Sequence, residues 1–252
     1  MSSDIQVTIG NDYVATVEIC RPPNNFFSTN LISGLAEIFE QLDQDDRVRA
    51  SVLCSQGKHF CAGADFSGHS EGNDTLGLYA GAVRIFRCVK PIVAAVQGAA
   101  IGGGLGLALT ADFRIAAPES RFGANFARLG FHQGFGLSVT LPELVGQQAS
   151  SDMLFTGRRV KGEEALEIGL CDRLVSLGEL REITSSYTRE IAKSAPLAVE
   201  SIRKTLRGDL ADRVEAATLH EAAEQARLSQ TEDWKEGIKA SAERRDPLFR
   251  RK

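Results

Sequence analysis

The sequence predicts an α/β fold, and the order of its apolar segments is the main reason. Alternating apolar residues at Ile5–Thr8 and Val14–Ile19 flank Gly10, Asn11 and Asp12, a pattern typical of a β-hairpin. Segments with strand character then alternate with segments of helical spacing, which favours α/β architecture. The further strands expected are Val48–Cys54, Ile92–Val96, Phe113–Ala116 and Arg121–Gly123, and the helices are Leu31–Leu42, preceded by a capping Thr29, and Leu76–Cys88.

After Leu180 the pattern becomes helical to the end of the sequence. Leu197–Leu206 and Val214–Leu228 have the spacing of amphipathic helices, and Asp209 or Asp212 is a suitable helix start. No stretch rich in Pro, Gly or Ser separates two independent domains. We therefore expect an α/β core over residues 1–190 and a helical region over residues 191–252 that serves packing or assembly.

Composition excludes several classes of partner. Of the 252 residues, 43% are hydrophobic and 25% are charged, and the formal net charge of −4 does not favour a nucleic-acid binder. The five cysteines form no CxxC pair, which favours reduced thiols in a cytoplasmic protein without a metal site. Residues Met1–Asp4 lack the basic and apolar regions of a signal peptide.

An uncharged run from Pro91 to Ala111 is long enough to cross a membrane. Gly98 and Gly102–Gly104 interrupt it, so we interpret it as a buried strand, a glycine turn and a buried helix over Leu105–Thr110. We expect no membrane partner.

Two glycine-containing segments carry the candidate chemistry, Gly57–Phe66 and Gln97–Leu107. The second follows a strand and opens a helix, where bare backbone can approach a ligand and unpaired N–H groups favour negative charge. It lacks the Gly-Lys-Ser/Thr ending of a phosphate loop and the spacing of the dinucleotide fingerprint. On these residues alone, a tight turn with close helix–strand packing remains an equal alternative.

Taken together, the two segments resemble the crotonase family, also called the enoyl-CoA hydratase/isomerase superfamily. The resemblance runs from about Val14 to Arg245. Its anchors are Phe60–Asp65, Gly102–Gly104, Ala111–Asp112, Arg121–Gly123, Leu129–Gly130, Thr156–Arg158 and Ala165–Leu170. It implies a spiral of strand–strand–helix units, with C-terminal helices that build homotrimers, commonly stacked into hexamers. It also implies an acyl-CoA thioester substrate of the kind used in fatty acid metabolism, and no permanently bound cofactor.

By this resemblance, the backbone N–H groups of Ala64 and Gly103 form an oxyanion hole for the thioester oxygen. Reactions beside a thioester carbonyl place charge on that oxygen as an enolate, and each fixed donor contributes about 3–4 kcal/mol to its stabilisation. Residues at Ala62, Ala64 and Phe66 are expected to contact CoA, with Arg21 near its phosphates. Gly103 and Phe126 are expected at the acyl end.

The sequence departs from the family where the family's hydratases carry two catalytic glutamates. Gly106 and Phe126 occupy those two positions, and Gly134 occupies an alternative position used by isomerases. His132 and Asp65 are the candidate replacements for acid–base catalysis, and both have alternative structural roles. His69, Glu71 and Asp74 lie on the loop expected to cover the acyl group, and Cys61 is expected to act as a small apolar residue.

Three functions therefore remain open, and all three predict binding of a CoA thioester. The first is an enzyme of the hydratase or isomerase type that stabilises a thioester enolate. The second is a decarboxylase of a malonyl-type CoA, in which loss of CO₂ itself generates the enolate. The third is a non-catalytic acyl-CoA-binding protein with an apolar tunnel beside Gly106 and Phe126.

Overall fold

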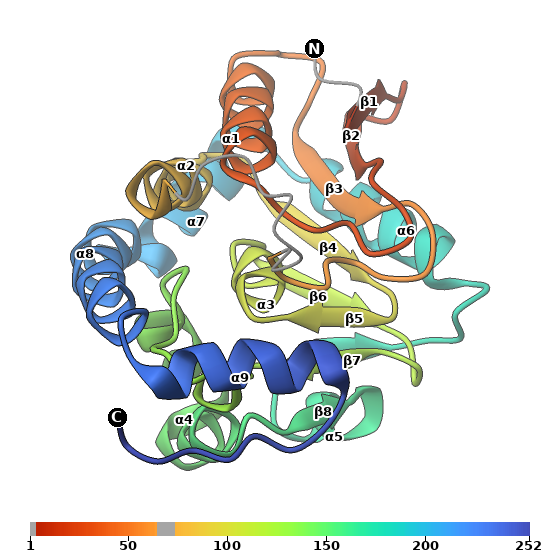
Figure 1. The fold of residues 1–252 in the computed structure, drawn as a ribbon. Coiled ribbons are helices and arrows are strands. Elements are labelled where there is room, and N and C mark those ends of the chain that lie inside the picture. Colours follow the sequence, from red (N-terminus) through yellow and green to blue (C-terminus); the bar gives the residue numbers. More distant parts are fainter. Residues whose placement is uncertain (1–3, 65–73) are drawn as a thin grey trace.

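The computed structural model describes residues 4–64 and 74–252 (Figure 1). Within these residues the strands form a six-stranded sheet in the order β1-β2-β3-β4-β6-β9 and a three-stranded sheet in the order β5-β7-β8. The strands are β1 (Ile5–Ile9), β2 (Val14–Ile19), β3 (Ala50–Ser55), β4 (Ile92–Val96), β5 (Ala99–Ile101), β6 (Phe113–Ala116), β7 (Arg121–Gly123), β8 (Arg159–Lys161) and β9 (Arg173–Leu174).

The helices lie between and after these strands. They are α1 (Thr29–Asp43), α2 (Thr75–Arg87), α3 (Gly103–Ala108), the short 3₁₀ helix η1 (Ala127–Leu129), α4 (Leu137–Thr156), α5 (Gly162–Glu167), α6 (Leu180–Ala192), α7 (Pro196–Arg207), α8 (Leu210–Leu228) and α9 (Glu232–Glu243).

The chain passes repeatedly from the large sheet to the small one and then into a helix. β4 lies in the large sheet, β5 in the small sheet, and α3 follows; β6 and β7 divide between the sheets in the same way before η1 and α4. The predicted hairpin forms between antiparallel β1 and β2, and the other neighbours in the large sheet pair in parallel. The expected spiral of strand–strand–helix units is therefore confirmed.

The large sheet is buried on both faces, which explains why its central strands are apolar without interruption. Successive side chains of a strand point to opposite faces. On one face Val52 of β3 and Val93 of β4 belong to a cluster that includes Leu180 of α6. On the other face Leu53 packs in the main core with Leu35 of α1. The main core extends through α1, α2 and α3 to the small sheet.

Two local predictions were wrong. Ser28, not Thr29, caps α1: its backbone is extended and its Oγ accepts a hydrogen bond from Leu31 N at 3.2 Å. The turn expected after β4 contains strand β5, and α3 begins at Gly103 rather than Leu105. A three-residue strand has no detectable period, and its parallel partner β7 comes about twenty residues later.

The uncharged run 91–111 is confirmed as buried strand and helix, because it folds into β4, β5 and α3. In the part of the chain that the structure describes, no helix combines the length and apolar character needed to span a membrane.

A buried ionic cluster ties α7 to the core. The Nε atom of Arg203 lies 2.9 Å from both carboxylate oxygens of Asp112, and its Nη1 donates to the Cys88 carbonyl. Asp112 also accepts from Ile92 N at 2.8 Å and lies 3.4 Å from Arg207. The Arg203 side chain is only 9% exposed, so Asp112 neutralises charge that water cannot reach.

Replacing Asp112 with Ala is expected to lower the free energy of unfolding by about 3–5 kcal/mol, because the buried guanidinium of Arg203 and the partly buried one of Arg207 lose their counter-charge. Glu40→Ala is the matched control. It breaks an exposed ion pair with Arg84 and should cost at most about 1 kcal/mol. Urea denaturation of both variants measures the difference, and equal losses would contradict the structural role given to Asp112.

Candidate active site

The two glycine-containing segments lie side by side and are joined by backbone hydrogen bonds. Phe60 N donates to Gln97 O at 2.8 Å and Cys61 N donates to Ala99 O at 2.9 Å, while Cys61 O accepts from Ile101 N at 3.0 Å. These bonds continue the pairing of the small sheet onto residues 60–61. The position of one segment therefore fixes the position of the other.

Phe27 contacts both residues that the family resemblance assigns to the oxyanion hole. It pairs with Ala64 in a parallel bridge, and its N–H donates to Gly63 O at 3.1 Å. A β-carbon placed on Gly103 would collide with the Phe27 ring, so the glycine is needed for this approach. The structure thus brings both Ala64 and Gly103 against Phe27, the first through its backbone and the second through its ring.

Gly102 makes the turn that presents Gly103. Its φ of 58° and ψ of −123° suit glycine alone, and they direct the chain from β5 into α3. Gly103 is the first residue of α3, where an N–H has no partner inside the helix. Among the described residues, neither Gly103 N nor Ala64 N donates to another backbone oxygen.

Aromatic rings surround Gly106 and Phe126, the two positions at which the family resemblance leads us to expect carboxylates in hydratases. A β-carbon on Gly106 would lie 2.6 Å from the Cβ of Phe135, whose side chain is fully buried. The Phe135 ring packs edge-on against Phe27 with ring centroids 6.1 Å apart. Phe126 is 7% exposed and packs edge-on against Phe131 at 5.6 Å. An aromatic ring therefore occupies the side-chain space at both positions, that of Phe135 beside Gly106 and that of Phe126 itself.

Helix α8 supports this wall with two side chains that sequence reasoning missed. Glu221 is fully buried and accepts from Gly136 N at 2.8 Å and Ser138 N at 3.0 Å. Gln225 accepts from the Tyr79 hydroxyl at 2.9 Å. The available signal was a pair of polar residues four apart in an alanine-rich amphipathic helix.

His132 lies on the same wall, beside α8. Its Nδ1 is 2.8 Å from the carbonyl oxygen of Gln133, so Nδ1 carries a proton there, and its ring packs edge-on against His220 at 5.6 Å. Within the described residues, no hydrogen bond or ring contact joins His132 to Ala64 or Gly103.

The residues expected at the CoA end lie around a second loop. Arg21 donates through Nη1 to Ser28 Oγ at 3.1 Å and is 3.6 Å from Asp4, with its side chain about one third exposed. Ala62 is half-buried and donates its N–H to Asn24 O at 2.9 Å. Arg21 and Ala62 thus frame the start of the segment that leads to Ala64.

Several other residues that the sequence suggested for the site either have another role in the structure or lie outside the described residues. Asp65, Phe66, His69 and Glu71 lie outside the described residues. Asp74 caps α2 through a hydrogen bond from Gly77 N to its Oδ1 at 2.8 Å, so the carboxylate already has a partner. Complete burial raises the pKa of the Cys61 thiol to about 11, which keeps it protonated and supports its interpretation as an apolar residue.

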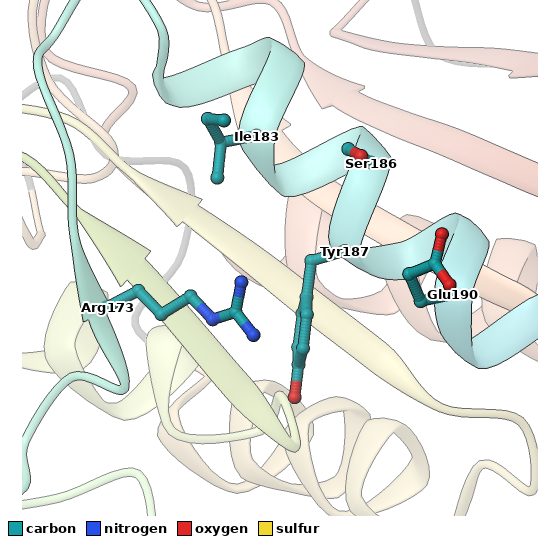
Figure 2. A pocket seen from close by; sticks show the side chains of 5 residues that line it. All are labelled: Arg173, Ile183, Ser186, Tyr187 and Glu190. Atoms are coloured by element: carbon teal, nitrogen blue, oxygen red, sulfur yellow. The ribbon is translucent and has the colours of Figure 1, made fainter.

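A shallow cavity of about 200 Å³ lies elsewhere, between β9 and α6 on the opposite face of the large sheet (Figure 2). The Arg173 guanidinium stacks over the Tyr187 ring at 4.2 Å there, a cation–π contact that packs α6 against the sheet edge. In the described chain, no group of three or more His, Cys, Asp or Glu side chains could hold a metal ion.

The family model described as enoyl-CoA hydratase/isomerase matches residues 10–252. The chain belongs to this family. The resemblance to the crotonase superfamily is thereby confirmed, and so is the predicted fold class.

Alignments with similar proteins cover nearly the whole chain. A probable enoyl-CoA hydratase of Bacillus subtilis is 32% identical over an alignment 252 positions long, gaps included, which covers 95% of this chain and 96% of the relative. A short-chain-enoyl-CoA hydratase of Clostridium acetobutylicum is 32% identical over an alignment 240 positions long, gaps included, which covers 92% of each chain. The crystal structure of an enoyl-CoA hydratase/isomerase from Pseudoalteromonas atlantica superposes with a TM-score of 0.89 at 31% identity, covering 98% of this chain and 100% of that one.

His59 joins the two glycine-containing segments of this family member with a side-chain hydrogen bond. Its Nδ1 accepts from Ala99 N at 3.1 Å, so the ring must be neutral at that atom. Burial lowers the pKa of His59, and the nearby charges of Lys58 and Arg159 lower it further. The folded protein therefore disfavours protonation of this histidine.

The contribution of His59 to stability should depend on pH. In the unfolded chain its pKa is about 6.5, above the folded value, so the contribution is complete above pH about 6.5 and is lost as pH falls below it. His59→Asn keeps an acceptor without the titration. Urea denaturation at a series of pH values should show a smaller acid-induced loss for the variant, and identical profiles would rule out the proposed bond.

Proposed function

We propose that this chain is an acyl-CoA enzyme in which the backbone N–H groups of Ala64 and Gly103 hold the thioester oxygen. The supporting observation is the junction of the two glycine-containing segments, which sets both residues against Phe27. Two fixed donors would stabilise the charge of a thioester enolate, each by about 3–4 kcal/mol. Membership in the enoyl-CoA hydratase/isomerase family supports a CoA thioester as the substrate.

The CoA half of the ligand would follow the loop that carries Arg21 and Ala62. The guanidinium of Arg21 is about one third exposed, so it can also face a phosphate. Phe66 completes the proposed CoA contacts, and Phe126 borders the acyl end with its buried ring. The site needs no permanently bound cofactor in this proposal.

The reaction would be of the hydratase or isomerase type without the two glutamates. Gly106 and Phe126 can neither donate nor accept a proton, so proton transfer would rest on other groups. Asp65 follows the proposed oxyanion residue directly, and His132 lies on the segment that carries the aromatic wall. These two are the candidate acid–base residues.

Decarboxylation is a second candidate, favoured by the aromatic surroundings of the site. The bond between Cα and the carboxylate of a malonyl-type CoA breaks, CO₂ leaves, and the electron pair moves onto the thioester as an enolate. No protein base is required for this step, and the enolate later takes a proton from water. Rings such as Phe27, Phe126 and Phe135 would desolvate the substrate carboxylate, which favours its loss.

Turnover of crotonyl-CoA, a 3-enoyl-CoA and methylmalonyl-CoA distinguishes these candidates. Replacing Gly103 with Val should reduce kcat/KM for the accepted substrate by about 100-fold or more, because the side chain collides with Phe27 and displaces the donor. Gly178→Val is the control, since a β-carbon at Gly178 meets no atom within 4 Å.

Unchanged kinetics in Gly103→Val would contradict the oxyanion assignment. Fast hydration of crotonyl-CoA that survives substitution of both His132 and Asp65 would contradict the acid–base assignment. Tight binding of all three thioesters without turnover would identify a non-catalytic acyl-CoA-binding protein.

The helical region over residues 191–252 is proposed to assemble the chain into homotrimers, alone or stacked as hexamers. Leu197, Ile202 and Leu206 of α7 are exposed although they are large and apolar, as is Leu219 of α8. Sedimentation should give three or six times the chain mass of 27.2 kDa, and Leu206→Glu should reduce it. A monomer at micromolar concentration would refute this part of the proposal. The cytoplasmic location stays a prediction.

A further inference from the structure

One face of α8 holds both ends of the segment from His132 to Ser138. At the C-terminal end, the two carboxylate oxygens of Glu221 accept from Gly136 N and Ser138 N, at 2.8 and 3.0 Å. At the other end, Gln225 Nε2 donates to His132 O at 2.9 Å. Glu221 and Gln225 are four residues apart, so they project from the same side of the helix.

Tyr79 of α2 completes this support. Its hydroxyl donates to Gln225 Oε1 at 2.9 Å, which orients the amide so that its Nε2 faces His132 O. A β-carbon on Gly134 would collide with the Tyr79 hydroxyl and lie 2.6 Å from Gln225 Nε2. The segment therefore approaches α2 and α8 as closely as its backbone allows.

Phe135 is the residue held between these two attachments. Its φ of 63° lies in the left-handed region, which is unfavourable for an aromatic residue and persists only where neighbours enforce it. This conformation directs the buried ring into the space beside Gly106, against Phe27 and Tyr79. The hydrogen bonds to α8 hold the backbone on both sides of this residue.

We propose that Phe135 limits the acyl group to a short chain and that Glu221 and Gln225 are positioning residues that fix its ring. The proposal rests on the proposed function, because it takes Gly103 as the residue that holds the thioester oxygen. Phe27 covers Gly103, and Phe135 packs on Phe27 and fills the space opposite α3. Acyl carbons that extend past the thioester toward α3 meet the Phe135 ring.

The nucleotide half of CoA is handled by other residues. Arg21 and Ala62 lie on the loop before Ala64, and no hydrogen bond or ring contact in the described chain joins them to the 132–138 segment. A change at Phe135 or Glu221 should therefore alter discrimination between acyl groups and leave the affinity for free CoA unchanged.

The experiment measures dissociation constants of free CoA, acetyl-CoA and octanoyl-CoA by calorimetry. In Phe135→Ala, affinity for octanoyl-CoA relative to acetyl-CoA should rise by about tenfold or more, since methylenes that gain a buried place leave water and strengthen binding. Glu221→Ala should shift the same ratio in the same direction. The double variant should shift it no further than Phe135→Ala alone, because Glu221 acts through Phe135.

Three controls separate positioning from general loss of structure. Glu215→Ala removes an exposed carboxylate from the same helix and should leave the ratio unchanged. Glu221→Gln keeps the side-chain volume and one acceptor and should give an intermediate shift, and Gln225→Leu tests the second attachment. Affinity for free CoA reports the integrity of the nucleotide half in every variant.

An unchanged ratio in Phe135→Ala would overturn the limit on acyl length. Additive shifts in the double variant, or a Glu221→Ala loss that is equal for free CoA and both thioesters, would overturn the positioning role. A wild-type chain that binds neither free CoA nor a thioester would overturn the proposed function and this inference together. Wild-type binding with failed variant predictions would overturn the inference alone.

Discussion

The structure of the candidate site depends on the backbone pairing between residues 60–61 and 97–101. Cys61 donates to Ala99 O and accepts from Ile101 N, so the loop before Ala64 extends the small sheet. A β-carbon on Gly104 would collide with the Cys61 carbonyl, which shows how closely α3 approaches this pairing. Two segments that lie about forty residues apart in the sequence thereby acquire the rigidity of a sheet, and preorganised donors need that rigidity.

The glycine at position 106 and the aromatic ring of Phe135 are parts of one packing arrangement. Gly106 has no side chain, and the ring of Phe135 uses the space that a longer side chain there would need. A carboxylate on α3 and a ring at residue 135 are therefore mutually exclusive without movement of the segment that α8 holds. The residues around Gly106 and Phe135 thus form a close-packed apolar arrangement.

Sequence patterns predicted those parts of the fold that are determined by residues close together in the chain. The hairpin, the central strands and the presence of a buried helix after the glycine run follow from periodicity and glycine placement within short windows, although strand β5 and the exact start of α3 do not. The attachment of the 132–138 segment to α2 and α8 could not be predicted in this way, because Tyr79 and Gln225 are separated by 146 residues. No period or turn signal marks such a pair, and α4 was missed because Gly146 interrupts it with a φ of 79°. Ser28 and Thr29 differ too little in chemistry for the cap to be assigned from sequence.

The charge state of the described site favours chemistry in which the substrate supplies its own negative charge. Burial raises the pKa of Cys61 to about 11 and also raises the pKa of Tyr79, so both stay protonated at neutral pH. His59 is kept neutral by burial and by its hydrogen bond from Ala99 N. Protonated Cys61 and Tyr79 provide no base, and the low polarity around them strengthens the interaction of an enolate with backbone donors. Decarboxylation suits these conditions, because one negative charge moves from a localised carboxylate to a thioester oxygen that the proposed donors at Ala64 and Gly103 can hold, and no charge is created in the process.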